Sequence, residues 1–170
     1  MIKRRKLIVL FVFLGAAAGV AVTLFFLLSP KKPTLTVNGE NIPVKKSSYI
    51  SMLGTNVIAL MGEKGNDVYF VNIRFMEGSP TANTTYNLKN REDLDRFSIG
   101  FEYCNSADKT MVLVRPIEAG FSDAEVSVGN FTENEKIGIS VSGKLSKDGY
   151  DFDFYVSGEI KYSDYKEIFG

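Results

Sequence analysis

Histidine and tryptophan are absent from the 170 residues, and cysteine occurs once, as Cys104. Histidine is the commonest general acid–base residue and metal ligand, so its absence removes the usual centre of hydrolytic and zinc sites. A single thiol can form neither an internal disulfide nor a cysteine-based metal site. The serines lack both a histidine base and a Gly-x-Ser-x-Gly context. The sequence therefore favours a protein that is not an enzyme, and it indicates no cofactor.

Positive and negative charges cancel overall, with 20 basic and 20 acidic residues, but they are unevenly distributed. Four of the basic residues form one cluster at positions 3–6. The rest of the chain therefore carries 16 basic and 20 acidic residues, a net charge of −4. Binding to phosphates needs a basic face, so this composition argues against a nucleic-acid partner.

The same basic cluster precedes a run of 22 uncharged residues, Leu7 to Leu28. A helix of that length spans about 33 Å, and the hydrocarbon core of a bilayer is about 30 Å thick. The positive-inside rule places the more basic flank in the cytoplasm. We therefore expect a cytoplasmic tail (1–6), a transmembrane anchor in the lipid bilayer (7–28), a linker (29–33) and an extracytoplasmic β domain (34–170).

A cleaved signal peptide is the alternative reading of this segment. Ala16-Ala17-Ala18 offers small residues for cleavage, but a cut there would leave apolar residues 20–28 on the mature terminus. The run is also longer than the usual signal core of about 7–15 residues. An anchor is the better interpretation. It places the protein in the inner or plasma membrane, with the β domain periplasmic or extracellular.

Within the predicted anchor, Gly15 and Gly19 form a Gly-x-x-x-Gly step. Small residues at that spacing let two membrane helices approach closely. This spacing allows the hypothesis of a homodimer through this helix face. Small residues are also common in membrane helices that do not associate, so this alternative stays open.

Beyond the anchor, apolar residues recur at every second position, the period of a strand with one buried face. The pattern predicts that Phe101 and Phe154 are buried and that Asp151 faces water. Val68 and Phe70 blur the alternation at one end of a predicted strand. The clearest strands are 69–75, 97–103, 137–141 and 150–156, and shorter candidates are 34–37, 41–44, 56–61, 84–88, 110–115 and 123–128.

Turn-forming residues separate these stretches, at Asn38-Gly39, 64–67, 105–108 and 147–149. Many short strands at this spacing predict an all-β fold, an antiparallel β-sandwich or small barrel of about 8–10 strands. Two segments also fit a helical stripe. One is 49–61, and the other is a short terminal helix with Tyr162, Tyr165 and Phe169 on one side.

The order of these features resembles the small envelope β-domains of unknown function found as lipoproteins in Bacteroidota. The resemblance covers most of 34–160 and implies an envelope β-sandwich without functional residues. The chain departs from that pattern because a predicted membrane helix stands where those proteins carry a lipid-modified cysteine. The matching stretches are Thr34-Leu-Thr-Val-Asn-Gly-Glu, a hairpin over 56–76, Thr85-Tyr-Asn-Leu, Val141-Ser-Gly-Lys-Leu and Gly149-Tyr-Asp-Phe-Asp-Phe-Tyr-Val-Ser-Gly.

Three carboxylates are the best candidates for a metal site. Asp151 and Asp153 are two apart on a predicted strand, and Asp148 lies in the preceding turn. Oxygen ligands of this kind suit Ca²⁺, but the rest of a calcium loop is missing, so a solvated strand face is the simpler reading. Asn83 and Asn130 match the glycosylation sequon, which applies only in a eukaryotic source.

Cys104 follows a predicted strand position that faces inward, so we place it on the outer face at the end of the strand. There it could link two chains, and a half-buried lone thiol is the alternative. The polar segment 78–95 interrupts the strand pattern and is either a functional loop or a surface excursion with one edge strand.

These observations favour a non-enzymatic binding or envelope-assembly module with an unidentified protein partner. The alternative is a carrier of an apolar small molecule or lipid, held between sheets or in a barrel mouth. A closed apolar cavity would favour the carrier. A solid core with an exposed apolar patch would favour the binding module.

Overall fold

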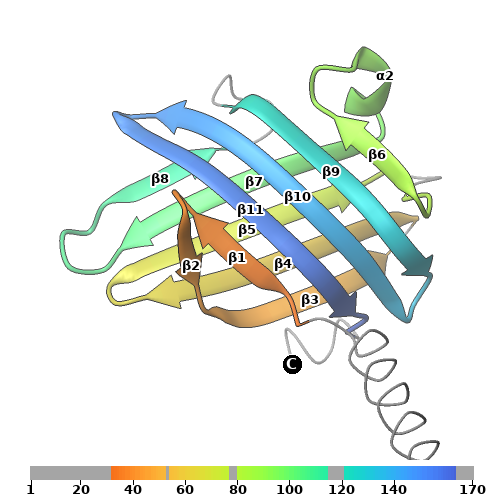
Figure 1. The fold of residues 1–170 in the computed structure, drawn as a ribbon, viewed down its shortest axis with the longest axis horizontal. Coiled ribbons are helices and arrows are strands. Elements are labelled where there is room, and N and C mark those ends of the chain that lie inside the picture. Colours follow the sequence, from red (N-terminus) through yellow and green to blue (C-terminus); the bar gives the residue numbers. More distant parts are fainter. Residues whose placement is uncertain (1–31, 53, 77–79, 115–120, 164–170) are drawn as a thin grey trace, which may run out of the picture. The chain divides into compact units, whose positions relative to one another are not determined.

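The computed structural model describes residues 32–52, 54–76, 80–114 and 121–163 (Figure 1). The chain divides into two compact units, Met1–Lys31 and Lys32–Gly170, and the description concerns the second. Within the described ranges, no helix is long and apolar enough to cross a membrane. The predicted anchor 7–28, with Gly15 and Gly19, lies outside these ranges, as do Tyr165 and Phe169 of the predicted terminal helix.

The described residues form an antiparallel β-sandwich of two sheets, as predicted, with eleven strands rather than 8–10. One sheet has six strands in the order β2-β1-β11-β10-β9-β6, and the other has five in the order β3-β4-β5-β7-β8. The strands of the two sheets cross as they lie over one another (Figure 1). The strands of the six-stranded sheet are β1 (Thr34–Val37), β2 (Glu40–Ile42), β6 (Thr84–Asn87), β9 (Phe121–Thr132), β10 (Lys136–Lys147) and β11 (Tyr150–Lys161). Those of the five-stranded sheet are β3 (Val44–Met52), β4 (Thr55–Lys64), β5 (Asp67–Phe75), β7 (Phe97–Asn105) and β8 (Met111–Val114).

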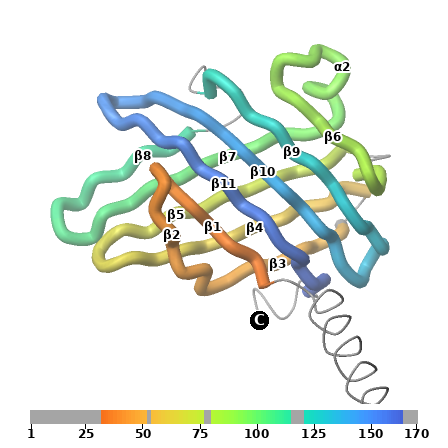
Figure 2. The backbone as a smooth tube through the Cα atoms, viewed as in Figure 1, coloured from red at the N-terminus to blue at the C-terminus, as the bar shows by residue number. Residues whose placement is uncertain are grey.

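The chain passes between the two sheets four times, from β2 to β3, β5 to β6, β6 to β7 and β8 to β9, and antiparallel hairpins join the other consecutive strands (Figure 2). Two of the turns, Asn38-Gly39 and Asp148-Gly149, have both residues at positive φ, between 50° and 81°. This is the geometry of a type I′ turn, whose twist matches that of the flanking strands. These turns lie where the sequence predicts them, and they set the register of β1–β2 and β10–β11.

Aromatic side chains from both sheets fill the space between them. Phe101 of β7 and Phe154 of β11 are fully buried, and their ring centroids lie 5.0 Å apart. Tyr86 of β6 contacts Phe75 and Phe97 of the five-stranded sheet at 5.4 and 5.7 Å. The predicted burial of Phe101 and Phe154 is confirmed, and the core is solid where these rings meet.

The helical alternative for 49–61 is wrong. These residues belong to β3 and β4, which form an antiparallel hairpin. The sequence did not show the first half of β3, because Lys45 to Ser48 have no apolar alternation. That segment is at the edge of its sheet, where charged side chains are tolerated and protect against further strand pairing.

The described part of segment 78–95 is a surface excursion with an edge strand, which is one of the two predicted alternatives. β6 pairs with β9, and the short helix α2 (Arg91–Leu94) follows. The side chain of Asn90 caps this helix by accepting a hydrogen bond from the Glu92 backbone N–H. Asp93 then accepts a hydrogen bond from the Asn87 backbone N–H, which ties the helix to β6.

Candidate functional site

The three carboxylates singled out from the sequence lie at the surface without converging. Asp148 occupies the β10–β11 turn, and Asp151 and Asp153 project from the exposed face of β11, as predicted. Asp153 forms an ion pair with Lys144 at 3.3 Å. Within the described part of the chain, no group of three or more Asp, Glu, Cys or His residues could hold a metal ion. Asn83 and Asn130 are exposed.

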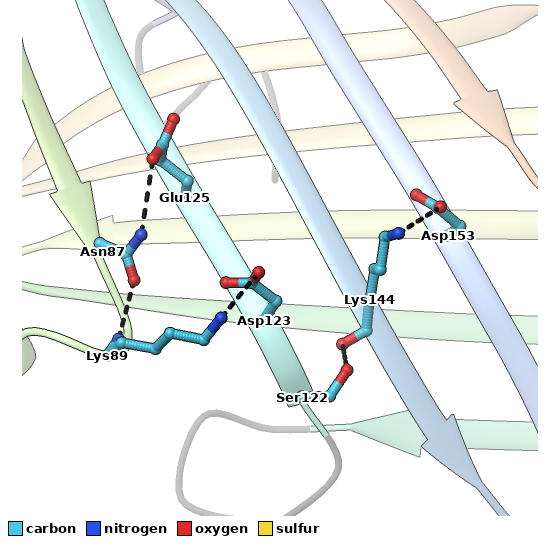
Figure 3. A network of polar contacts seen from close by, with 7 residues as sticks. All are labelled: Asn87, Lys89, Ser122, Asp123, Glu125, Lys144 and Asp153. Atoms are coloured by element: carbon cyan, nitrogen blue, oxygen red, sulfur yellow. Dashed lines mark hydrogen bonds and ion pairs between the residues drawn. The ribbon is translucent and has the colours of Figure 1, made fainter.

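The outer face of the six-stranded sheet carries polar side chains that pair across β6, β9, β10 and β11 (Figure 3), and the aromatic Tyr155 of β11 is 45% exposed on it. Lys89 pairs with Asp123 at 3.0 Å, and Asn87 donates to Glu125 at 3.4 Å. Hydroxyl pairs such as Thr85–Ser127 continue this pattern across the strands. Exposed ion pairs of this kind contribute about 0–1 kcal/mol each, so this face is a solvated surface.

The outer face of the five-stranded sheet is different, because apolar side chains cross it from strand to strand. Met61 of β4 stands opposite Phe70 of β5, and Val68 stands opposite Cys104 of β7. Cys104 in turn stands opposite Met111 of β8, which is 64% exposed. We call these five side chains, together with Val57 and Ala59 of β4, the apolar stripe.

Strand parity explains why these side chains point outward. Ile58, Leu60, Val71 and Ile73 are buried in the core, so their neighbours along β4 and β5 face the other way. The sequence carried this signal in Val68 and Phe70, which blurred the alternation, and in the continuous apolar run of β4. The predicted outer-face position of Cys104 agrees with its half-buried place in the stripe.

A hollow of about 750 Å³ opens on the β3–β4–β5 side of this face. Ala59, Met61 and Phe70 of the apolar stripe form its floor. Lys45 and Lys46 of the edge strand line the hollow from one side, beside two serines of the same strand. It is thus a surface depression with an apolar base and a basic rim.

A second hollow of about 740 Å³ lies on the other half of the same face, and both polar and apolar side chains line it. Asn72, Arg74 and Glu102 contribute to its lining, and Leu94 of α2 closes one side. Phe70 in the first hollow and Asn72 in the second are consecutive outward positions of β5. The two hollows are therefore neighbours on one surface.

At the turn end of β5 and β7, by contrast, the space between the sheets is filled by rings. Tyr103 contacts Tyr69 on its own sheet at 5.3 Å and Phe152 of the opposite sheet at 5.3 Å. Burial, followed by the negative charge of Asp67, raises the pKa of Tyr69 to about 12. The Tyr103 hydroxyl donates to Asp67 at 2.8 Å, and burial followed by this hydrogen bond raises the pKa of Tyr103. These rings occupy the space through which a ligand would enter from this end.

No family model, curated protein or solved structure matches this chain. The candidate site is therefore argued from the geometry alone. It consists of the apolar stripe and the basic-rimmed hollow on the outer face of the five-stranded sheet.

Proposed function

We propose that this protein is a non-enzymatic binding module, anchored in a membrane by residues 7–28, with its β domain outside the cytoplasm. In this proposal, the outer face of the five-stranded sheet is the binding surface. The observation that carries it is the contrast between the two outer faces. One carries mainly polar groups that pair across the strands, whereas the other carries the apolar stripe, half-buried apart from Met111, which is 64% exposed.

Apolar side chains at a surface, here bordered by polar ones such as Arg74 and Glu102, can mark a site that another molecule covers. Half-buried Met61, Phe70 and Val68 would gain further burial on contact, and burial of apolar area stabilises by about 25 cal/mol per Å². The anchor would tether the β domain to the membrane through the short linker 29–33. Association of two anchors through Gly15 and Gly19, and kinship with the envelope domains of Bacteroidota, stay predictions.

The test is site-specific photo-crosslinking with the full chain in its native membrane. A photoreactive amino acid replaces Ala59 on the apolar stripe, and its matched control replaces Ser142, a small outward residue of β10. We expect crosslinked products from position 59 and few or none from position 142. Equal crosslinking at the two positions, or none at either, would contradict the proposed binding surface.

A carrier of an apolar or amphiphilic small molecule is the second candidate, and one observation favours it. The hollow over Ala59, Met61 and Phe70 measures about 750 Å³. Small-molecule sites usually measure about 300–1,000 Å³. The filled core argues against a ligand held between the sheets, so the carrier version of the proposal uses the surface hollow.

A further inference from the structure

The basic rim of the hollow is a product of the strand geometry. Lys45 and Lys46 both line the hollow, as do Ser47 and Ser48 of the same strand. The register of β3 against β4 shifts between Val44 and Lys46, so Lys45 is the extra residue of a β-bulge. Bulges are common where a strand re-aims a side chain toward a binding site.

These two lysines also lack acidic partners. Elsewhere on the surface, Lys64, Lys89, Lys136 and Lys144 form ion pairs with acidic side chains. Neither Lys45 nor Lys46 has a carboxylate within 4 Å among the residues that the structure describes. Both are exposed. The rim thus carries two lysines that form no direct ion pair with an acidic side chain of the described residues.

The floor beside them is apolar and extends away from the rim. Lys46 stands opposite Met61, and Met61 stands opposite Phe70, so the three residues form a row across β3, β4 and β5. Adjacent strands are about 4.8 Å apart, so this row extends about 10 Å from the lysine to the phenylalanine. The hollow therefore has lysines on one side and an apolar floor beside them, and beyond this floor Glu102 of β7 stands opposite Phe70.

We infer that the hollow binds a single-chain anionic amphiphile, with its head at Lys45 and Lys46 and its apolar chain over Met61 and Phe70. The charge of the rim selects an anionic head, and the row across the strands selects an extended apolar chain. A fatty acid carboxylate is the simplest molecule of this class. The inference rests on the binding surface proposed above and names its ligand chemistry.

The chain contains no tryptophan, so one introduced tryptophan gives a fluorescence signal of its own. Phe70→Trp places this reporter on the floor of the hollow, and Tyr155→Trp places a control reporter on the outer face of β11. Each full-length variant is reconstituted in nanodiscs of a neutral phosphatidylcholine. The probe is dibromododecanoate, whose bromine atoms quench tryptophan at short range. Dibromododecanol, which has the same chain and no charge, is the matched ligand control.

We expect saturable quenching of the Phe70→Trp reporter by the acid and much weaker quenching of the Tyr155→Trp reporter. Adding Lys45→Gln and Lys46→Gln should weaken acid binding about 3- to 10-fold, the range expected for two exposed ionic contacts. Binding of the alcohol should not change. Lys161→Gln, at an exposed lysine outside the hollow, should leave acid binding unchanged. Raising the ionic strength should weaken binding of the acid only.

Three results would overturn the inference. The first is equal quenching of the two reporters, which would indicate probe dissolved in the bilayer. The second is unchanged acid affinity in the double lysine variant, with its circular dichroism spectrum and melting temperature preserved. The third is complete displacement of the acid by acetate, which would indicate an anion site that does not recognise the chain. Crosslinking at position 59 together with any of these results would keep the binding surface and remove only this ligand class.

Discussion

Gly143 on β10 faces the core directly opposite Phe154 on β11, and the phenylalanine ring occupies the space that a side chain at Gly143 would need. A Cβ at Gly143 would lie 2.4 Å from Cε1 and Cζ of Phe154. The ring cannot move aside freely, because it is fully buried and stacked on Phe101. Gly143→Ala should therefore strain the core. Overpacking costs about 1–3 kcal/mol, and the entropic gain of replacing a strand glycine offsets about 0.5–1 kcal/mol of that.

The same substitution should change sign when the ring is removed. Phe154→Ala alone should lower the free energy of unfolding by about 3–5 kcal/mol. In that background Gly143→Ala no longer meets a ring, so the extra methyl group should stabilise the fold by about 0.5–1 kcal/mol. Urea unfolding of the compact unit Lys32–Gly170 measures all four corners of this double-mutant cycle.

Gly138→Ala is the matched control on the same strand. Its Cβ would contact only backbone atoms of Asn130 at 3.5 Å, an ordinary van der Waals distance. We expect this variant to be neutral or slightly more stable than the wild type. If Gly143→Ala cost no more than Gly138→Ala, or cost the same with and without the Phe154 ring, the ring would not be the reason for the glycine.

Four further predictions follow from the same packing, charges and sequence pattern. Phe101→Ala should lower the free energy of unfolding by about 3–5 kcal/mol, whereas Asp151→Ala on the exposed face should change it little. Urea unfolding measures both variants. Comparable losses in the two would refute the assignment of buried and exposed strand faces. The pKa of Tyr69 is raised to about 12, so the folded state keeps a proton that the unfolded state loses above its ordinary pKa of about 10. The contribution of this proton to the free energy of unfolding should thus be complete below pH 10 and fall as the pH rises toward 12. In Tyr69→Phe, the urea midpoint should fall less steeply over this pH range. An unchanged slope would contradict the prediction. A reporter enzyme that is active only outside the cytoplasm, fused after Gly170, should be active. If the anchors associate, Gly15→Ile should abolish energy transfer between labelled chains in liposomes.

Alternation along the chain predicted most of this fold, because each buried face is encoded every second residue. The strands around Phe101 and Phe154, the turns at Asn38-Gly39 and Asp148-Gly149, and the outward position of Cys104 all follow from local patterns. The polar character of the Asp151 and Asp153 face followed in the same way. The predicted anchor, too, depends only on composition, since 22 uncharged residues suffice to span a bilayer.

Pairing between distant strands was decided only by the tertiary structure. Parity tells which residues share a face, but it does not tell which sheet a strand joins, because the partner is chosen by contacts far along the chain. β1 therefore had no predicted partner, although it pairs with β11 more than a hundred residues later. The edge strand β3 had no apolar period to reveal it, because its first half faces solvent.

Local sequence patterns could not predict the candidate site, for the same reason. Lys46, Met61 and Phe70 form one row only because β3, β4 and β5 are adjacent in this register. Lys45 joins that row through a bulge, which depends on how two strands pair and not on either sequence alone. The sequence by itself determined which side chains are apolar and which are charged, and strand pairing determined that a basic rim and an apolar floor share one hollow.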